Sequence, residues 1–202
     1  MSASERKNKF FDLREKRIAK SAIGDPEISP NFTSKYLLGH YQKIKQLDKD
    51  LGRLPSKEEF FFLQTDGAFN AFTFIPFVAR NYAIKELFAS TYSISRRTIE
   101  AMVELHDAGL IERITLLINE SMPKRNPVTI DLLNGLVKSR ANITVKYAWT
   151  HAKICLLKTM DAHYCIEGSG NWSENAHYEQ YVFANSLGLY EFRKEMFDSI
   201  SS

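Results

Sequence analysis

Two neighbouring side chains have types and a spacing that suit attack on a phosphate. His151 and Lys153 are two positions apart in a stretch that predicts a strand from 151 to 158. Alternate residues of a strand point to the same face, so the two side chains are expected about 7 Å apart. An imidazole can attack phosphorus while an ammonium neutralises the phosphate oxygens. The pair therefore predicts a nucleophile and a cation acting on one anion.

A second polar stretch, Gly168-Ser169-Gly170-Asn171, follows the next predicted strand, residues 163–167. It presents a hydroxyl and an amide between glycines, and glycines let backbone N–H groups approach a ligand closely. Together with the histidine and lysine, this stretch provides one nucleophile and three groups suited to phosphate oxygens.

The combined pattern resembles the HxK…GSxN signature of the phospholipase D superfamily. His151-Ala152-Lys153 matches its first part, and Asp161, followed by six residues and then Gly168 to Asn171, matches its second part. One departure is that seven residues separate the lysine from the aspartate where the family has four, and the expected acid position holds Lys158. The family's bacterial single-domain nucleases also carry a downstream glutamate that orients the histidine, and Glu179 is placed for that role. HxK alone carries no information, whereas HxK followed by GSxN and a glutamate is fairly specific.

The resemblance implies a mechanism without metal or cofactor. His151 would attack phosphorus and form a covalent phosphohistidine, which splits one difficult step into two. Lys153, Ser169 and Asn171 would stabilise the charge of the transition state. A second histidine would protonate the leaving oxygen and later activate water.

The family's chemistry requires two HxK motifs, and this chain contains one. The other histidines are followed by unrelated residues: His40 by Tyr-Gln, His106 by Asp-Ala, His163 by Tyr-Cys and His177 by Tyr-Glu. The second catalytic histidine is therefore expected from another copy, which predicts a two-fold symmetric homodimer with the sites at its interface.

Further residues are candidates for binding the rest of a substrate. Ser95, Arg96 and Arg97 follow a predicted strand and open a predicted helix, where ligands and anions gather; they either hold a flanking phosphate or form a cap with two solvated arginines. Trp149 and Trp172 bracket the motif and either stack on a base or pack in the core. The predicted substrate-binding set is Ser95, Arg96, Arg97, Gly168, Gly170 and Trp172.

Alternating patterns from Glu58 onward predict an α/β domain with a mixed, mostly parallel sheet sandwiched by helices. Ser95 is the expected N-cap of a helix that Gly109 ends. Strands are predicted at 60–63, 86–94, 113–119, 143–147, 151–158, 163–167 and 178–184, and helices at 75–85, 96–108, 128–139 and 187–200.

The first part of the chain has a different character. Residues 1–55 predict a helical N-terminal extension, with a basic helix over 7–20 and a second helix over 34–51 that Pro55 closes, ahead of a catalytic domain over 56–202. The basic helix either follows a nucleic-acid backbone or exposes a solvated face. The charged N-terminus has no apolar core of a secretory signal, and no apolar run of about 18 residues occurs, so a cytoplasmic protein without stable membrane association is expected.

Composition sets broad limits on the class of protein. A chain of 202 residues with 44% hydrophobic and 25% charged residues is long enough to bury a core, and a net charge of +3 permits an anionic partner without requiring one. Cys155 and Cys165 form no CxxC motif and are expected to be small buried hydrophobes in a reducing cytosol. A zinc site combining them with His151 and His163 fails on spacing.

Three functions follow from these patterns. The first is a metal-independent nuclease, with nucleic acid, DNA above all, as its substrate. The second is a phospholipid phosphodiesterase, which the single motif and the lack of an obvious membrane-binding face disfavour. The third is a nucleic-acid-binding protein that keeps the fold and does little chemistry, which the altered aspartate spacing keeps open.

Overall fold

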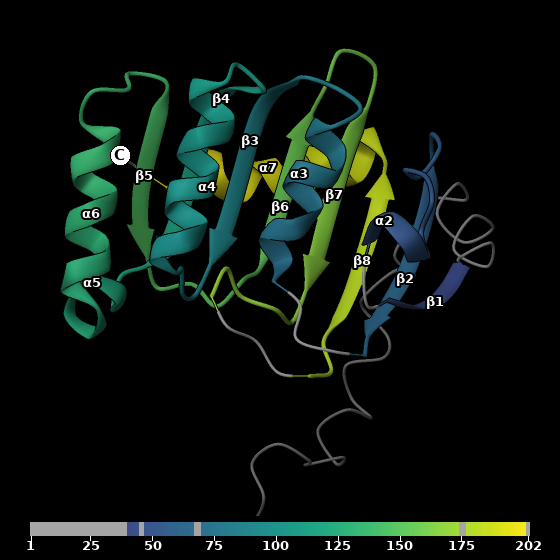
Figure 1. Ribbon diagram of the computed structural model, residues 1–202, viewed down its shortest axis with the longest axis horizontal. Helices are drawn as coiled ribbons and strands as arrows, with labels where there is room; N and C mark the ends of the chain where they lie inside the picture. Colours follow the sequence, from purple (N-terminus) through teal and green to yellow (C-terminus); the bar gives the residue numbers. More distant parts are fainter. Residues whose placement is uncertain (1–39, 45–46, 67–69, 174–176, 201–202) are drawn as a thin grey trace, which may run out of the picture. The chain divides into compact units, whose positions relative to one another are not determined.

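An eight-stranded sheet is the centre of the part of the chain that the structure describes, residues 40–44, 47–66, 70–173 and 177–200 (Figure 1). The molecule is represented by a computed structural model. The strands are β1 (His40–Ile44), β2 (Glu59–Thr65), β3 (Ile84–Thr91), β4 (Ile111–Asn119), β5 (Ile143–Ala148), β6 (Ile154–Lys158), β7 (His163–Gly168) and β8 (Gln180–Asn185). Their order across the sheet is β1-β2-β8-β7-β6-β3-β4-β5.

The sheet is mixed, but it is not mostly parallel as the sequence predicts. Its middle pairs, β2–β8, β8–β7, β7–β6 and β6–β3, are antiparallel, while β3–β4, β4–β5 and β1–β2 are parallel. The reason is local. β6 and β7 are joined by a tight turn in which the Thr159 N–H donates to the Ala162 carbonyl at 2.9 Å, and so short a connection forces antiparallel pairing. Longer connections that contain a helix, which parallel strands need, join β1 to β2, β3 to β4 and β4 to β5.

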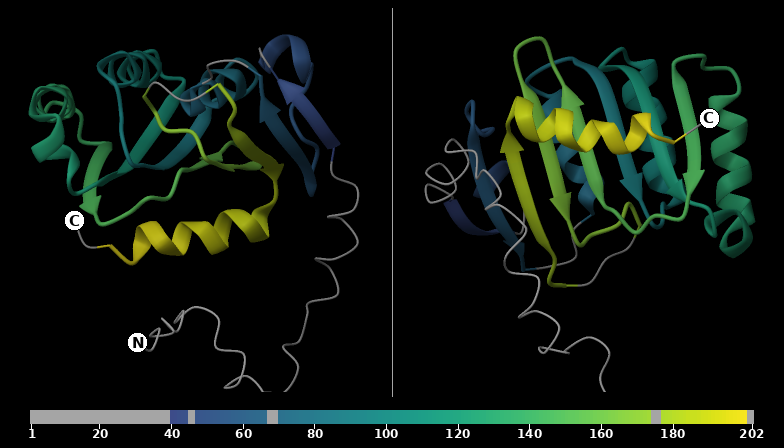
Figure 2. Two further views of the ribbon diagram at one scale, coloured as in Figure 1. Left: turned by 90° about the horizontal axis from the view of Figure 1, so that it is seen from below. Right: turned by 180° about the vertical axis from the view of Figure 1, so that it is seen from behind.

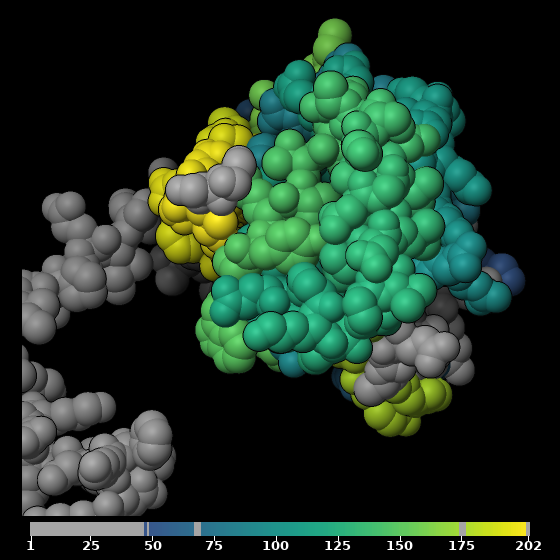
Figure 3. All heavy atoms as spheres, turned by 90° about the vertical axis from the view of Figure 1, so that its left-hand side faces the viewer, coloured from purple at the N-terminus to yellow at the C-terminus, as the bar shows by residue number. Residues whose placement is uncertain are grey.

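Helices lie on both faces of the sheet (Figure 2). They are α2 (Leu47–Asp50), the short 3₁₀ helix η3 (Ala71–Thr73), α3 (Phe74–Ala79), α4 (Arg96–Asp107), α5 (Met122–Arg125), α6 (Pro127–Val137) and α7 (Leu187–Asp198). α3, α4 and α6 cover one face, and α7 crosses the other. Figure 3 shows the flank that α5 and α6 form beside β5. The predicted α/β class, with a sheet between helices, is confirmed.

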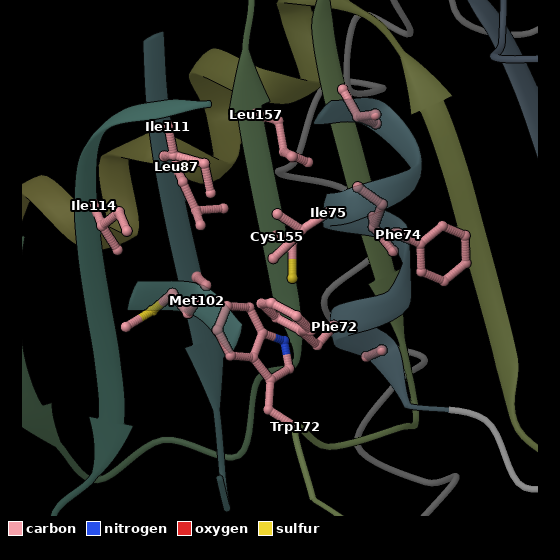
Figure 4. Packing of buried hydrophobic residues seen from close by; sticks show 14 of the residues in the cluster. Phe72, Phe74, Ile75, Leu87, Met102, Ile111, Ile114, Cys155, Leu157 and Trp172 are labelled. Atoms are coloured by element: carbon pink, nitrogen blue, oxygen red, sulfur yellow. The ribbon is translucent and has the colours of Figure 1, made fainter. Parts of the chain in front are cut away.

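Apolar residues of the sheet divide into two clusters because strand side chains alternate between faces. Under α3 and α4, Phe72, Met102 and Cys155 pack around Trp172, as Figure 4 shows. Under α7, Leu156 and Cys165 pack against its aromatic side chains. Since Cys165 stands opposite Leu156 in the β6–β7 register, the two cysteines point to opposite faces and cannot form a disulfide. Both are buried free thiols, as predicted.

Two predicted helices differ from the structure. The helix expected over 75–85 ends at Ala79, because the N–H groups of Asn81 and Tyr82 both turn back to the Val78 carbonyl and the chain then enters β3. The helix expected over 34–51 is replaced, in its described part, by β1 and α2. Pairing with β2 satisfies backbone groups of β1, and tertiary pairing of this kind overrides helix propensity. The basic helix over 7–20 lies outside the described residues.

Candidate active site

His151 and Lys153 lie in the loop between β5 and β6, at the lower end of the sheet in Figure 1, and not on a strand. The prediction of a strand from 151 is wrong at its start, since β6 begins at Ile154. The backbone before it bonds instead with buried polar side chains. Asn119 donates from Nδ2 to the Thr150 carbonyl at 2.6 Å, and Ser90 donates from Oγ to the Ala152 carbonyl at 3.1 Å.

These two polar side chains fix the backbone on both sides of the histidine. Ser90 and Asn119 are 0% and 2% exposed, at the carboxyl ends of β3 and β4. A buried polar side chain is costly unless it is hydrogen-bonded, so the two carbonyls are held firmly in place. The imidazole of His151 is thereby presented to solvent on a rigid loop.

The imidazole and the ammonium are in direct contact. Lys153 Nζ lies 2.9 Å from His151 Nδ1 and donates to the His151 carbonyl at 2.8 Å. Partial burial lowers the pKa of Lys153, and the negative charge of Glu179 acts in the opposite direction. The predicted pair is therefore brought together, at hydrogen-bond distance rather than at strand spacing.

Ser169 and Glu179 lie near this pair, since the charge of Glu179 acts on Lys153. The Ser169 hydroxyl donates to a Glu179 carboxylate oxygen and accepts from the Gln180 N–H at 3.1 Å. The Gly168 N–H donates to the Lys153 carbonyl at 3.2 Å, which ties the two loops together. The sequence did not predict the serine contact of Glu179. Its role as the orienting partner of His151 stays a prediction.

Gly168 has a packing reason to be glycine. A Cβ at this position would lie 2.3 Å from the Gln180 carbonyl oxygen and 2.4 Å from a ring carbon of Tyr181. Real Cβ atoms do not approach backbone oxygens so closely, so β7 and β8 would have to separate locally. Glycine here lets β8, which Glu179 directly precedes, approach the loop carrying Ser169.

The rest of the GSxN loop is anchored by Trp172. Its side chain is 1% exposed and lies in the core beside Phe72 and Cys155 (Figure 4), so it cannot stack on a base. This removes Trp172 from the predicted substrate-binding set. The Trp172 N–H donates to the Ser93 carbonyl at 3.1 Å, which fixes the loop against the end of β3. Asn171 is half-buried and Gly170 buried between Ser169 and this anchor.

Ser95 caps α4 as predicted. Its Oγ accepts from the Thr98 N–H at 3.3 Å, and its N–H donates to the Trp172 carbonyl at 2.9 Å. Arg96 is exposed and pairs with Glu100 at 2.8 Å, and Arg97 is exposed as well. The contacts of Ser95 and Arg96 favour the cap alternative over a phosphate site.

Sequence reasoning missed Tyr92 and Arg125. The Tyr92 ring lies 4.7 Å from the His151 ring, between their centroids, and 5.9 Å from Lys153 Nζ. The Arg125 guanidinium stacks on the same ring at 4.1 Å and donates to the Tyr92 carbonyl at 2.9 Å. Tyr92 directly follows β3, and ligands gather at the carboxyl ends of strands in α/β sheets, so its position was the available signal.

Asp161 lies away from the site. It is exposed in the turn between β6 and β7, with the whole length of β6 between it and Lys153. The seven-residue spacing thus carries the aspartate to the opposite end of the sheet. Among the described residues, no group of three or more His, Cys, Asp or Glu side chains could hold a metal ion.

Comparisons with known proteins give a fold and no family. No family model and no curated protein match the chain. Polyphosphate kinase from Porphyromonas gingivalis is similar in structure at a TM-score of 0.52 and 12% identity, over 71% of this chain. The match spans 26% of the kinase, so the chain corresponds to about a quarter of that protein.

A second solved structure is less similar. TrmBL2, described as an archaeal chromatin protein with a novel mode of DNA binding, matches at a TM-score of 0.44 and 12% identity, over 68% of this chain and 50% of that one. At 12% identity, the likeness to the polyphosphate kinase structure shows a shared fold alone.

Within the described residues, no helix has the length and apolar character needed to cross a membrane.

Proposed function

We propose that this protein is a metal-independent phosphodiesterase, a nuclease acting through a phosphohistidine on His151. The observation that carries the proposal is the contact of His151 with Lys153 at 2.9 Å on a loop that buried polar side chains hold. An exposed imidazole beside a cation is suited to attack an anionic phosphodiester, because the cation neutralises charge that develops on the phosphate oxygens.

The resting contact has a consequence for the attack. A charged ammonium can only donate hydrogen bonds, so Nδ1 of His151 accepts from Lys153 with its lone pair. In a neutral imidazole the single ring hydrogen is then on Nε2. Nε2 can attack phosphorus only after that hydrogen has moved to Nδ1. A bound phosphate allows this movement, because its oxygens compete with Nδ1 for the Lys153 ammonium and so leave Nδ1 able to take the hydrogen.

The hydroxyl of Ser169 and the amide of Asn171 take the role of further donors to the phosphate in this proposal. The Ser169 hydroxyl donates to the Glu179 carboxylate, so a phosphate oxygen can accept from it only by displacing that carboxylate. Otherwise the phosphate oxygen accepts from the Asn171 amide alone. The second histidine comes from a second copy of the chain, in a homodimer whose shared site faces the substrate from both sides.

The test is cleavage of plasmid and single-stranded DNA in excess EDTA by wild type, His151→Ala and His163→Ala. His163 is a half-buried histidine at the far end of β7 and serves as the matched control. We expect cleavage by wild type and the control, loss by roughly 10⁴-fold or more in His151→Ala, and a covalent adduct on His151 by mass spectrometry. A dimer on a sizing column is expected. Cleavage that needs metal, or that persists in His151→Ala, rejects the proposal.

A second candidate function is binding of nucleic acid without turnover. It follows if a bound phosphate does not release Nδ1 from Lys153, because the ring then keeps its hydrogen on Nε2 and is a poor nucleophile there. In that case wild type and His151→Ala bind an oligonucleotide equally, neither cleaves it, and affinity falls as salt rises.

A further inference from the structure

Two aromatic residues and two cations lie beside His151 in sequence or in space: Trp149, Tyr92, Lys153 and Arg125. Trp149 is two residues away on the same loop, and its side chain is 80% exposed. Tyr92 carries the Arg125 guanidinium on its ring, and Arg125 also donates from Nε to the Ser121 hydroxyl at 2.9 Å. The described contacts of Arg125 are with a ring, a carbonyl and a hydroxyl, and none is with a carboxylate.

Aromatic side chains and cations in one place are suited to binding one kind of substrate. A nucleic-acid strand repeats an anionic phosphate and an aromatic base, and unpaired bases stack on exposed aromatic side chains while the backbone follows cations. In a duplex the faces of the bases are covered by their neighbours, so an exposed indole has nothing to stack on unless the duplex opens.

We propose that the site takes a single strand of nucleic acid, with Arg125 holding a phosphate next to the one at His151 and Trp149 stacking on an unpaired base. This rests on the proposed function for its substrate class, but binding can be measured without turnover. Arg125 is suited to the phosphate because its stacked guanidinium is pre-oriented, and a pre-oriented fork loses less freedom on binding. Tyr92 is the positioning residue that holds the guanidinium beside the imidazole.

The two tryptophans make the test direct, because Trp172 is 1% exposed and Trp149 is 80% exposed. His151→Ala is titrated with a single-stranded oligonucleotide and with the same sequence as a duplex. We expect the single strand to quench the exposed tryptophan's fluorescence and to bind more tightly than the duplex. In His151→Ala/Trp149→Ala, affinity for the single strand falls about 5- to 150-fold by loss of one stacked base.

Matched controls separate these effects from general ones. Phe192 is 61% exposed on α7, so Phe192→Ala removes an exposed ring on the other face of the sheet and leaves affinity unchanged. Arg125→Ala lowers the dependence of log affinity on log salt by about 0.7, the value for one phosphate of a single strand, whereas Arg113→Ala does not.

The outcomes distinguish this inference from the proposed function. Equal affinity for single strand and duplex, or an unchanged affinity in the Trp149 variant, overturns it even if His151 proves catalytic. A blue-shifted Trp149 emission in free protein, with loss of the dimer in Trp149→Ala, also overturns it, because the ring then packs against a second copy. Single-strand binding without any cleavage supports the subsite while the nuclease proposal fails.

Discussion

Lys153 and Arg125, at one end of the sheet, are held differently from the cations at the other end. At the end with the β6–β7 turn, cations pair with carboxylates: Arg53 with Glu59, Lys85 with Glu112, Arg113 with Glu86, and Arg140 with Asp107. At the His151 end, Arg96 and Arg193 also pair with carboxylates, those of Glu100 and Glu167. Lys153 and Arg125 differ from them, because they contact an imidazole and a tyrosine ring, and in the described ranges neither is paired with a carboxylate. A paired cation has its partner within the fold, whereas Lys153 and Arg125 keep donors for a ligand.

The pKa directions agree with this contrast. The hydrogen bond from Arg140, and then the one from His106, holds the pKa of Asp107 well below its usual range, and the Asp107 hydrogen bond raises the pKa of Arg140. The fold thus favours the charged form of both partners. For Lys153 it does the reverse, since burial lowers the pKa of the ammonium. Functional sites typically contain a group whose charged form is disfavoured by the fold.

A hollow of about 490 Å³ lies at the paired end, lined among others by Arg53, Tyr82, Asp161 and Asn185. Its lining contains neither histidine nor lysine, and its cation, Arg53, is paired with Glu59. The contacts of its charged groups therefore distinguish the His151 loop from this hollow.

The largest expected effect comes from removing one cation at each end. Lys153→Met should lower kcat/KM about 10²- to 10³-fold, because the charge on the phosphate oxygens loses its counter-ion, and should leave stability unchanged or raised, since a partly buried charge is removed. Arg113→Met should leave kcat/KM unchanged and lower stability slightly. Cleavage rates and urea midpoints of both variants decide this. The contrast fails if Lys153→Met is as active as wild type but less stable.

A smaller effect is expected from adding one methyl group at each end. Gly168→Ala places a Cβ against the Gln180 carbonyl and should cost about 1–3 kcal/mol or more, with loss of activity because Ser169 and Glu179 are displaced. Gly109, after α4, has φ +74 and open space around it, so Gly109→Ala should cost about 1–2 kcal/mol from backbone strain alone. Urea unfolding and kcat/KM test the pair. Full activity in a stably folded Gly168→Ala would show that the glycine is not needed for the site.

Local patterns predicted most of the elements. The N-cap Ser95 and the glycine after α4 predicted that helix nearly to its ends, because capping depends on a few adjacent residues. Strand directions were not predictable in the same way. The parallel prediction followed from the alternation of strands and helices before Ala148, whereas the antiparallel middle depends on the tight turn at 159–162 and on where β8 returns.

The site was predicted in part for a similar reason. The motif residues His151, Lys153 and Ser169 were found from spacing, but their contacts depend on Ser90 and Asn119, which lie far away in the sequence. Nothing in the local pattern indicates that these two residues hold the histidine loop. Trp172 was assigned to the substrate on proximity to the motif, yet its ring is buried, because a residue next to a loop can face either way.

The smallest effect should appear in the pH dependence of stability, with each end controlling a different limb. The folded pKa of Asp107 lies below its ordinary value of 3.8, so its pairing stabilises the protein above that value and is lost as pH falls through the folded pKa. Lys153 has a folded pKa below 10.5, so the unfolded chain binds more protons between the two values and stability rises with pH there. Asp107→Asn should therefore flatten only the acid limb, and Lys153→Met only the alkaline limb. Urea midpoints measured from acid to alkaline pH test both, and a single variant that flattens both limbs would show that the two ends are not separate.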